Sequence, residues 1–129
     1  MKHEKITVLV VEPTKKPYVK EIAAGLESLQ HEVGGYIQVV YPWAEMCAIV
    51  CDEEAKLNDK ELNRALRDDN GHIYDIVAGI FLIVGLSEND FTSLEPEHIQ
   101  RFQALFAVPE VFVAIGRKLL VLPGGGLDG

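Results

Sequence analysis

The stretch that decides the fold is IYDIVAGIFLIV, residues 73–84, the most hydrophobic run in the chain. A strong turn signal, DDNG at residues 68–71, precedes it. An apolar run bounded in this way is typical of a strand that is buried on both of its faces. Gly79, inside the run, indicates a bulge or a close approach by another backbone segment. We therefore predict a strand over residues 73–84 at the centre of a sheet.

Further strands are predicted on both sides of this stretch, from short apolar runs that are rich in β-branched residues and bounded by polar or turn residues. The first run opens the sheet. The second and third flank the break YPWA at residues 41–44 and should form a hairpin or an offset pair. The last two should pair across Gly116 and Arg117. These predicted strands cover residues 6–11, 36–40, 46–51, 112–115 and 118–122.

Two segments have apolar residues at three- and four-residue spacing, which is the pattern of an amphipathic helix. The first covers residues 19–29 and should end before the glycines at residues 34–35, which favour helix termini. The second begins at Pro96, where a first-turn proline is tolerated, and ends at Pro109. The apolar residues of a third, polar segment permit a short helix over about residues 60–66.

Together these elements predict an α+β fold. We expect a single domain over residues 1–123, with a mixed or mainly antiparallel sheet and two main helices packed against it. A doubly wound parallel sheet would need more crossover helices than the pattern contains. Residues 124–129 are rich in glycine, and we expect them to form a flexible tail.

The charge of the chain limits its partners. Its 129 residues include 20 acidic and 12 basic side chains, a formal net charge of −8. Such a field repels a phosphate backbone, so we expect no general nucleic-acid binding. Solubility is the simpler interpretation of this acidity, and mimicry of DNA is the alternative. The sequence contains no signal-peptide pattern and no apolar run long enough to span a membrane, so we expect a cytoplasmic protein.

Residue types that often carry chemistry are few and scattered. Cys47 and Cys51 lack the spacing and the second ligand pair of a zinc site, and we expect both to be reduced core residues. The acidic run at residues 52–54 lacks the order of a calcium-binding loop. We therefore expect no metal, no cofactor and no catalytic residue. Four histidines are expected to be exposed: His3, His31, His72 and His98.

Residues 56–67, KLNDKELNRALR, gather cations and amides within an otherwise acidic chain. In a helix, Asn63 and Arg67 would share one face, and Lys60 and Arg64 would lie on an adjoining face. Guanidinium groups and amides offer planar donors that suit a phosphate, a carboxylate or the edge of a base. The alternative is that the two arginines only pair with carboxylates that are close in the sequence, namely Glu61, Asp68 and Asp69.

Several ordered motifs resemble one known family. They are VGGYI at 33–37, YP at 41–42, LNRAL at 62–66, IYDI at 73–76 and DFTSL at 90–94. Through them the chain resembles domain of unknown function 3846 from about residue 6 to residue 112. The family's pattern has glycine in place of Ala55 and threonine in place of Ile80, so a function that depends on either would not carry over. The resemblance implies a phage, plasmid or conjugative element inside a bacterial cell, and it implies no assigned activity.

Three hypotheses about function follow. The first is a non-enzymatic binding module of a phage or mobile element that captures a small anionic ligand such as a cyclic nucleotide, by analogy with counter-defence proteins that sequester immune signals. The second is an acidic protein-interaction factor that inhibits a host defence enzyme. Under each hypothesis the sequence leaves the oligomeric state open, a homo-oligomer included. The third is an enzyme that acts on a nucleotide through Glu53, Glu54 or Asp90. The first hypothesis places its pocket at Lys56, Asn58, Asn63, Arg64 and Arg67, with Tyr41 and Trp43 as stacking surfaces.

Overall fold

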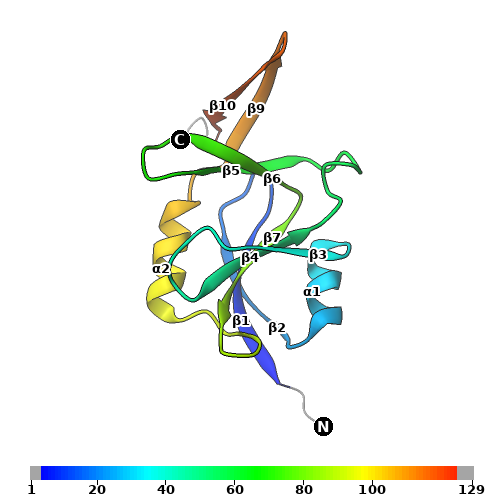
Figure 1. The fold of residues 1–129 in the computed structure, drawn as a ribbon, viewed down its shortest axis with the longest axis vertical. Helices are drawn as coiled ribbons and strands as arrows, with labels where there is room; N and C mark the ends of the chain where they lie inside the picture. The colour runs from blue at the N-terminus through cyan, green and yellow to red at the C-terminus, as the bar shows by residue number, and fades with distance from the viewer. Residues whose placement is uncertain (1–3, 125–129) are drawn as a thin grey trace.

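The computed structural model describes residues 4–124. Two helices and mostly antiparallel strands make an α+β fold, as predicted (Figure 1). The elements follow one another as β1 (Lys5–Val11), β2 (Tyr18–Ala23), α1 (Leu26–Val33), β3 (Ile37–Val40), β4 (Cys47–Asp52), β5 (Leu62–Arg67), β6 (Ile73–Ala78), β7 (Phe81–Leu86), β8 (Phe91–Thr92), α2 (Pro96–Leu105), β9 (Glu110–Ile115) and β10 (Lys118–Pro123).

The central sheet has the strand order β2-β1-β7-β4-β3, and β8 also pairs with β7. Neighbouring strands in this sheet are antiparallel. Two further pairs of strands, β5–β6 and β9–β10, form separate antiparallel sheets of two strands each. The predicted hairpin of β3 with β4 and the predicted final hairpin of β9 with β10 are therefore confirmed.

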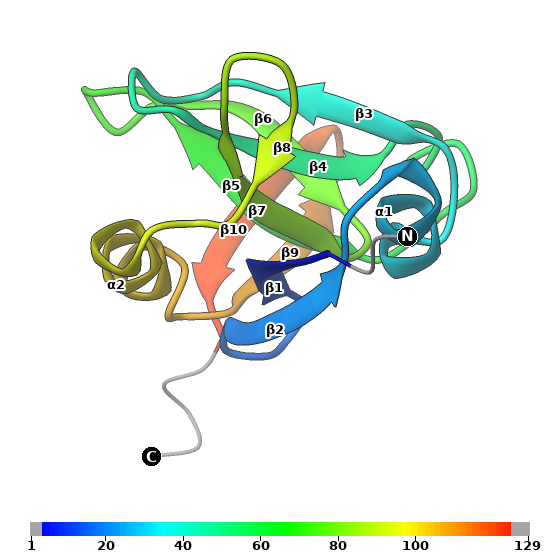
Figure 2. The same cartoon turned by 90° about the horizontal axis from the view of Figure 1, so that it is seen from below.

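Both faces of the central sheet are covered, which explains why its inner strands have continuous apolar sequences. On one face, Leu9, Ile49 and Ile83 pack with Phe102 of α2. On the other face, neighbouring residues of the same strands pack with Leu29 and Val33 of α1. Figure 2 shows the two helices on opposite sides of the sheet. Because side chains alternate along a strand, one apolar run supplies both cores.

The helix predicted over residues 19–29 is wrong in its first half. Residues 18–23 form β2, which pairs with β1 along its whole length, and α1 begins only at Leu26. Gly25 separates the two elements with a φ of 119°. Ile22 alone is buried in β2, and β1 would otherwise expose an unpaired edge. The side-chain spacing of residues 18–23 fits both a helix and a strand. Hydrogen bonding to the backbone of β1 therefore selects the strand.

The short helix predicted over residues 60–66 is also wrong, because Leu62–Arg67 is strand β5. Its partner is β6, the first half of the stretch 73–84, which the structure divides into two strands. Gly79 lies between them with a φ of 75°, a conformation that a side chain strains. The second half, β7, lies at the centre of the sheet as predicted.

The remaining predictions divide into those confirmed and those outside the described residues. α2 begins at Pro96 as expected, and both cysteines are free and buried. Within residues 4–124, no helix combines the length and the apolar character that crossing a membrane requires. The predicted flexible tail lies outside the described residues except for Gly124, whose amide donates to the Pro109 carbonyl at 2.7 Å.

Candidate functional site

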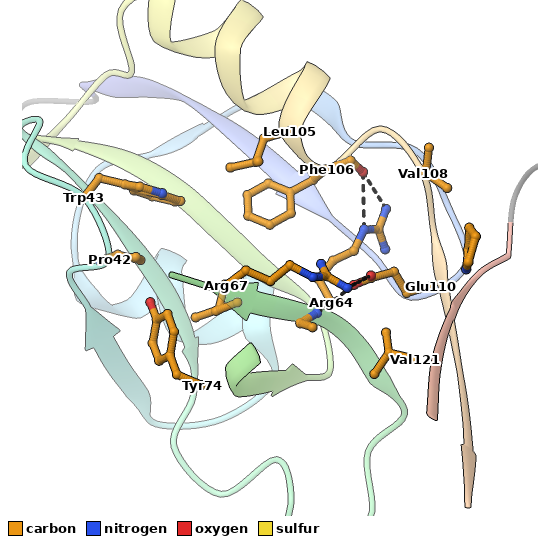
Figure 3. A pocket seen from close by; sticks show the side chains of 13 residues that line it. Pro42, Trp43, Arg64, Arg67, Tyr74, Leu105, Phe106, Val108, Glu110 and Val121 are labelled. Carbon is orange, nitrogen blue, oxygen red and sulfur yellow. Dashed lines mark hydrogen bonds and ion pairs between the residues drawn. The ribbon is translucent and has the colours of Figure 1, made fainter. Parts of the chain in front are cut away.

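A cavity of about 400 Å³ lies between β5, the end of α2 and the base of the β9–β10 hairpin (Figure 3). This volume is within the range of about 300–1,000 Å³ that small-molecule sites occupy. Its wall is mostly apolar, and its polar side chains are Arg64, Arg67, Glu110 and Tyr74. The apolar wall includes Pro42, Trp43, Leu105, Phe106, Val108 and Val121.

The Arg64 guanidinium forms one side of this cavity and is almost completely buried. Its Nε and Nη2 donate to the Phe106 carbonyl at 3.2 and 2.9 Å, and Nη2 also donates to the Lys15 carbonyl at 2.6 Å. Nη1 donates to Asn63 Oδ1 at 2.8 Å. The guanidinium thereby joins β5 to the end of α2 and to the turn after β1. All of these acceptors are neutral, so none of them cancels its charge.

Burial lowers the pKa of Arg64, and the charge of Glu110 acts in the opposite direction. The group nevertheless stays protonated, because an arginine side chain keeps its proton in proteins. Asn63 is itself fully buried, and its amide donates to the carbonyls of Val11 and Gly79 at 2.9 and 2.8 Å. Both of these predicted site residues thus have structural hydrogen bonds, and of the two only Arg64 reaches the cavity wall.

Arg67 and Glu110 form an ion pair across the same cavity, with 2.8 Å between Nη2 and Oε2 (Figure 3). The other oxygen of Glu110 accepts the backbone N–H of Ala65 at 2.7 Å, so both of its oxygens are engaged. Arg67 remains 40% exposed, and Nη2 is its only guanidinium nitrogen with a hydrogen-bond partner among residues 4–124. Its Nε and Nη1 are therefore available to a ligand.

These groups give the cavity wall a net positive charge. Two guanidiniums and one carboxylate leave a charge of +1 at this place, within a chain whose formal charge is −8. The charge of Arg64 acts through an interior of low polarity, where it is screened less than a surface charge. The site is thus electrostatically opposite to the chain as a whole.

Trp43, an aromatic residue of the wall, is held in place by the core. The ring of Trp43 lies 4.2 Å from that of Phe102 and 6.3 Å from that of Phe106, measured between ring centroids. Tyr74, on β6, lies near Trp43 at the end of the cavity opposite Glu110 (Figure 3). A fixed ring such as that of Trp43 provides a surface on which a planar ligand can stack.

The structure brings only some of the predicted site residues together. Trp43, Arg64 and Arg67 line one cavity, whereas the other predicted residues do not. Lys56 is exposed and pairs with Asp75 at 3.0 Å, Asn58 lies beside a separate shallow hollow, and Tyr41 is exposed. The alternative prediction, that the arginines pair with carboxylates, is correct for Arg67 as to the type of contact. The carboxylate belongs to Glu110, however, and not to one of the predicted residues nearby in the sequence.

Two polar residues of the cavity, Glu110 and Tyr74, were missed from the sequence. Glu110 follows Pro109 at the start of β9, far from Arg67 along the chain, so spacing could not connect them. Tyr74 belongs to the IYDI motif, which is the one sequence signal that points to it. Both enter the site through the packing of β5 against β6 and β9.

Other chemical groups of the chain lie apart from this cavity. Glu53, Glu54 and Asp90 are exposed and do not line it. His98 is half-buried, which corrects the expectation of exposure, and its Nδ1 lies 3.3 Å from Cys47 Sγ. His31 and His72 are exposed as predicted, whereas His3 lies outside the described residues. In the part of the chain that the structure describes, no three His, Cys, Asp or Glu side chains gather as metal ligands would.

Both thiols should react slowly in the folded chain. Burial, followed by the charges of Asp75 and Asp52, raises the pKa of Cys51 to about 11, and burial also raises the pKa of Cys47. Because the thiolate is the reactive form, iodoacetamide at about pH 8 should alkylate Cys51 about one hundred times more slowly in the folded chain than in urea. Mass spectrometry of timed samples measures both rates. Equal rates with and without urea would contradict this prediction.

Comparison with protein families places most of the chain in a known family. The model of the family described as domain of unknown function (DUF3846) matches residues 6–107, which ends before the β9–β10 hairpin. Searches among curated proteins and among solved structures found no match.

Proposed function

The chain belongs to the DUF3846 family, and we propose that it is a binding module that captures a small planar anion, such as a nucleotide, in the cavity lined by Trp43, Arg64 and Arg67. The observation that carries this proposal is the coexistence of a net positive charge and a fixed aromatic wall in one cavity of suitable volume.

The charge supports an anionic ligand. Arg64 brings a guanidinium that no carboxylate contacts directly, and the pair of Arg67 with Glu110 adds no net charge. An anion in the cavity would gain from this field and from the remaining donors of Arg67. A doubly charged group such as a phosphate would contact mainly Arg67, because the donors of Arg64 are already occupied. Arg64 would act chiefly through its charge.

The aromatic wall supports a planar body on that anion. Trp43 is held against Phe102, so its ring does not have to be ordered when a ligand stacks on it. Stacking on an aromatic side chain contributes about 1–3 kcal/mol per base in nucleic-acid complexes. A ligand with both a base and a phosphate would therefore use both features of the wall.

Binding without turnover is the form of this proposal that the wall supports best. Its one carboxylate, Glu110, has both oxygens engaged, by Ala65 and by Arg67. A general base needs a free oxygen within reach of the proton that it removes. We therefore propose capture of the ligand. If the protein is encoded by a phage or another mobile element, its biological role would be to sequester a nucleotide signal that a host defence system uses.

The test uses Trp43, which is the only tryptophan in the chain. Nucleoside monophosphates and cyclic nucleotides are titrated while the fluorescence of Trp43 is followed, and calorimetry measures the dissociation constants. The matching nucleosides and inorganic phosphate are titrated as separate probes. A nucleotide should change the fluorescence and bind more tightly than either part alone.

Arg67→Ala should weaken this binding roughly 10- to 100-fold, the loss expected for one hydrogen bond to a charged group. Arg101→Ala is the matched control, because Arg101 is similarly exposed and also pairs with a glutamate, Glu45, but does not line the cavity. It should leave the dissociation constant unchanged. No binding of any nucleotide by the unmodified chain, or an equal loss in both variants, would overturn the proposal.

A further inference from the structure

The charged side chains of the cavity wall limit the charge of the ligand that the cavity can hold. They are the guanidiniums of Arg64 and Arg67, which contribute +2, and the carboxylate of Glu110, which lowers the sum to +1. A ligand with a single negative charge would bring the sum to zero. A ligand with two negative charges would leave −1 in the cavity.

The carboxylate of Glu110 is fixed in this wall. One of its oxygens accepts the backbone N–H of Ala65 at 2.7 Å, and the other accepts Nη2 of Arg67 at 2.8 Å. Its side chain is only 12% exposed. Because Glu110 would have to break both contacts to move away, an anion that enters the cavity meets this negative charge as well as the two positive ones.

Phosphate esters fall into two classes by charge. A monoester loses its second proton with a pKa of about 6, so it carries about −1.5 to −2 at pH 7. A diester has no second proton to lose, and it carries a single negative charge. The difference between the two classes is thus the difference between a matched and an unmatched charge in this cavity.

An unmatched charge would be costly here for two reasons. The wall is mostly apolar, so a ligand in the cavity gives up part of its contact with water. The chain as a whole has a formal charge of −8, which repels a dianion about twice as strongly as a monoanion. Both effects favour the singly charged ligand.

The arrangement of the wall favours the same class. Trp43 and Tyr74 lie at one end of the cavity and Val108 and Val121 at the other, with the guanidiniums between them (Figure 3). The valine side chains have no hydrogen-bond donor, and the carboxylate of Glu110 lies near them (Figure 3). A diester has carbon on two of its four phosphate oxygens and a monoester on one. The diester therefore presents fewer charged oxygens to this part of the wall.

We propose that the ligand is a phosphodiester with one negative charge, such as a cyclic mononucleotide, and that Glu110 excludes phosphomonoesters. This proposal rests on the proposed function, because it names the class of ligand for the same cavity. Glu110 is in this way the residue that determines specificity, while Arg67 supplies the donors that contact the phosphate.

The first test compares three compounds that share a base: the nucleoside 5′-monophosphate, its methyl ester and the 3′,5′-cyclic monophosphate. Calorimetry at about pH 7.5 measures their dissociation constants for adenine, guanine, cytosine and uracil. For any base that binds, the methyl ester should bind at least about 10-fold more tightly than the monophosphate. The order of the methyl ester and the cyclic compound then distinguishes a linear diester from a cyclic one.

The second test changes the charge of the monophosphate on the unmodified chain. For a second pKa of about 6, the singly charged form is about 3% of the monophosphate at pH 7.5 and about 76% at pH 5.5. Its affinity should therefore rise as the pH falls, by up to roughly 25-fold, the ratio of these fractions. The methyl ester keeps its charge, so it is the control for protein groups that titrate in this range.

The third test changes the charge of the wall. Glu110→Gln makes the sum +2, so the preference for the methyl ester over the monophosphate should fall at least about 10-fold. Glu45→Gln is the matched control, because Glu45 also pairs with an arginine, Arg101, but does not line the cavity. It should leave the preference unchanged. The preference compares two ligands on one variant, so a general loss of affinity cancels, and circular dichroism checks that both variants fold.

The outcomes separate this proposal from the proposed function. If the monophosphate binds as tightly as the methyl ester at pH 7.5, or does not gain affinity at pH 5.5, the diester is the wrong class and nucleotide binding still stands. An unchanged preference in Glu110→Gln would overturn the role of Glu110. If none of the compounds binds, both proposals are wrong.

Discussion

Arg64→Ala is expected to lower the free energy of unfolding by about 3–5 kcal/mol, because each buried acceptor left unpaired costs about 1–3 kcal/mol and the lost side-chain volume adds to this. The carbonyls of Phe106 and Lys15 would lose the donors that now reach them at 2.9 and 2.6 Å. The substitution would also leave an empty space, because Arg64 is the largest of the fully buried side chains. Urea unfolding, followed by the fluorescence of Trp43, measures the loss.

Two control variants separate the shape of the guanidinium from its charge. Arg64→Lys keeps the charge but replaces a planar group of five donors by a single ammonium, so its loss should be intermediate. Arg67→Ala should cost less than about 1 kcal/mol, because its ion pair is partly exposed. If Arg64→Ala were as stable as Arg67→Ala, the structural role assigned to Arg64 would be wrong.

Lys60→Met is expected to lower the free energy of unfolding by about 3 kcal/mol, because it leaves a buried carboxylate without its counter-ion. The Lys60 ammonium lies 2.6 Å from Oδ2 of Asp52, whose side chain is only 3% exposed. The same ammonium donates to the carbonyls of Val33 and Gly34 at the end of α1, at 3.2 and 3.1 Å. Loss of the lysine would therefore disturb both the loop after β4 and the end of this helix.

The pH dependence of stability should show whether Lys60 stabilises the fold through the carboxylate of Asp52. Burial acts to raise the pKa of Asp52, but Lys60 and the backbone N–H of Glu54 outweigh it, so the pKa is lowered from 3.8. A lowered pKa in the folded state means that this contribution to stability is present above the ordinary pKa and is lost as the pH falls below it. In Lys60→Met the burial effect remains without the ammonium, so the carboxyl should take up a proton more readily.

The stability difference between Lys60→Met and the unmodified chain should therefore be largest near neutral pH and should shrink as the pH falls toward about 3. Asp52→Asn combined with Lys60→Met should recover most of the loss at neutral pH, because no buried charge remains. Urea unfolding at a series of pH values tests both statements. A difference that does not change with pH would show that Lys60 acts through α1 alone.

The strands of the central sheet could be predicted because they are buried on both faces. Each of β1, β4 and β7 has a short apolar sequence of the kind that is typical of a strand buried on both faces. α2 could be predicted from Pro96 and its apolar spacing. The errors fall at residues 18–23 and 62–67, where the sequence mixes polar and apolar residues. In both segments a neighbouring strand supplies the hydrogen bonds that decide the structure.

The candidate site could be predicted only in part for the same reason. Arg64, Arg67 and Trp43 were recognised as residue types that suit a planar anion, and all three line one cavity. The helical arrangement predicted for Arg64 and Arg67 was wrong, and the strand that replaces it has register shifts on both sides of its centre. Those shifts and the pairing with β6 set the directions of the side chains, which no local pattern contains.

The sequence by itself determined the α+β class, the buried strands and the membership of the DUF3846 family, since these depend on local runs of residues and on ordered motifs. Only the tertiary structure decided that Arg64 is a buried support, that Arg67 faces a cavity and that Glu110 is its partner. The physical reason is distance along the chain. A buried charge needs acceptors from several elements at once, and folding alone brings those elements together.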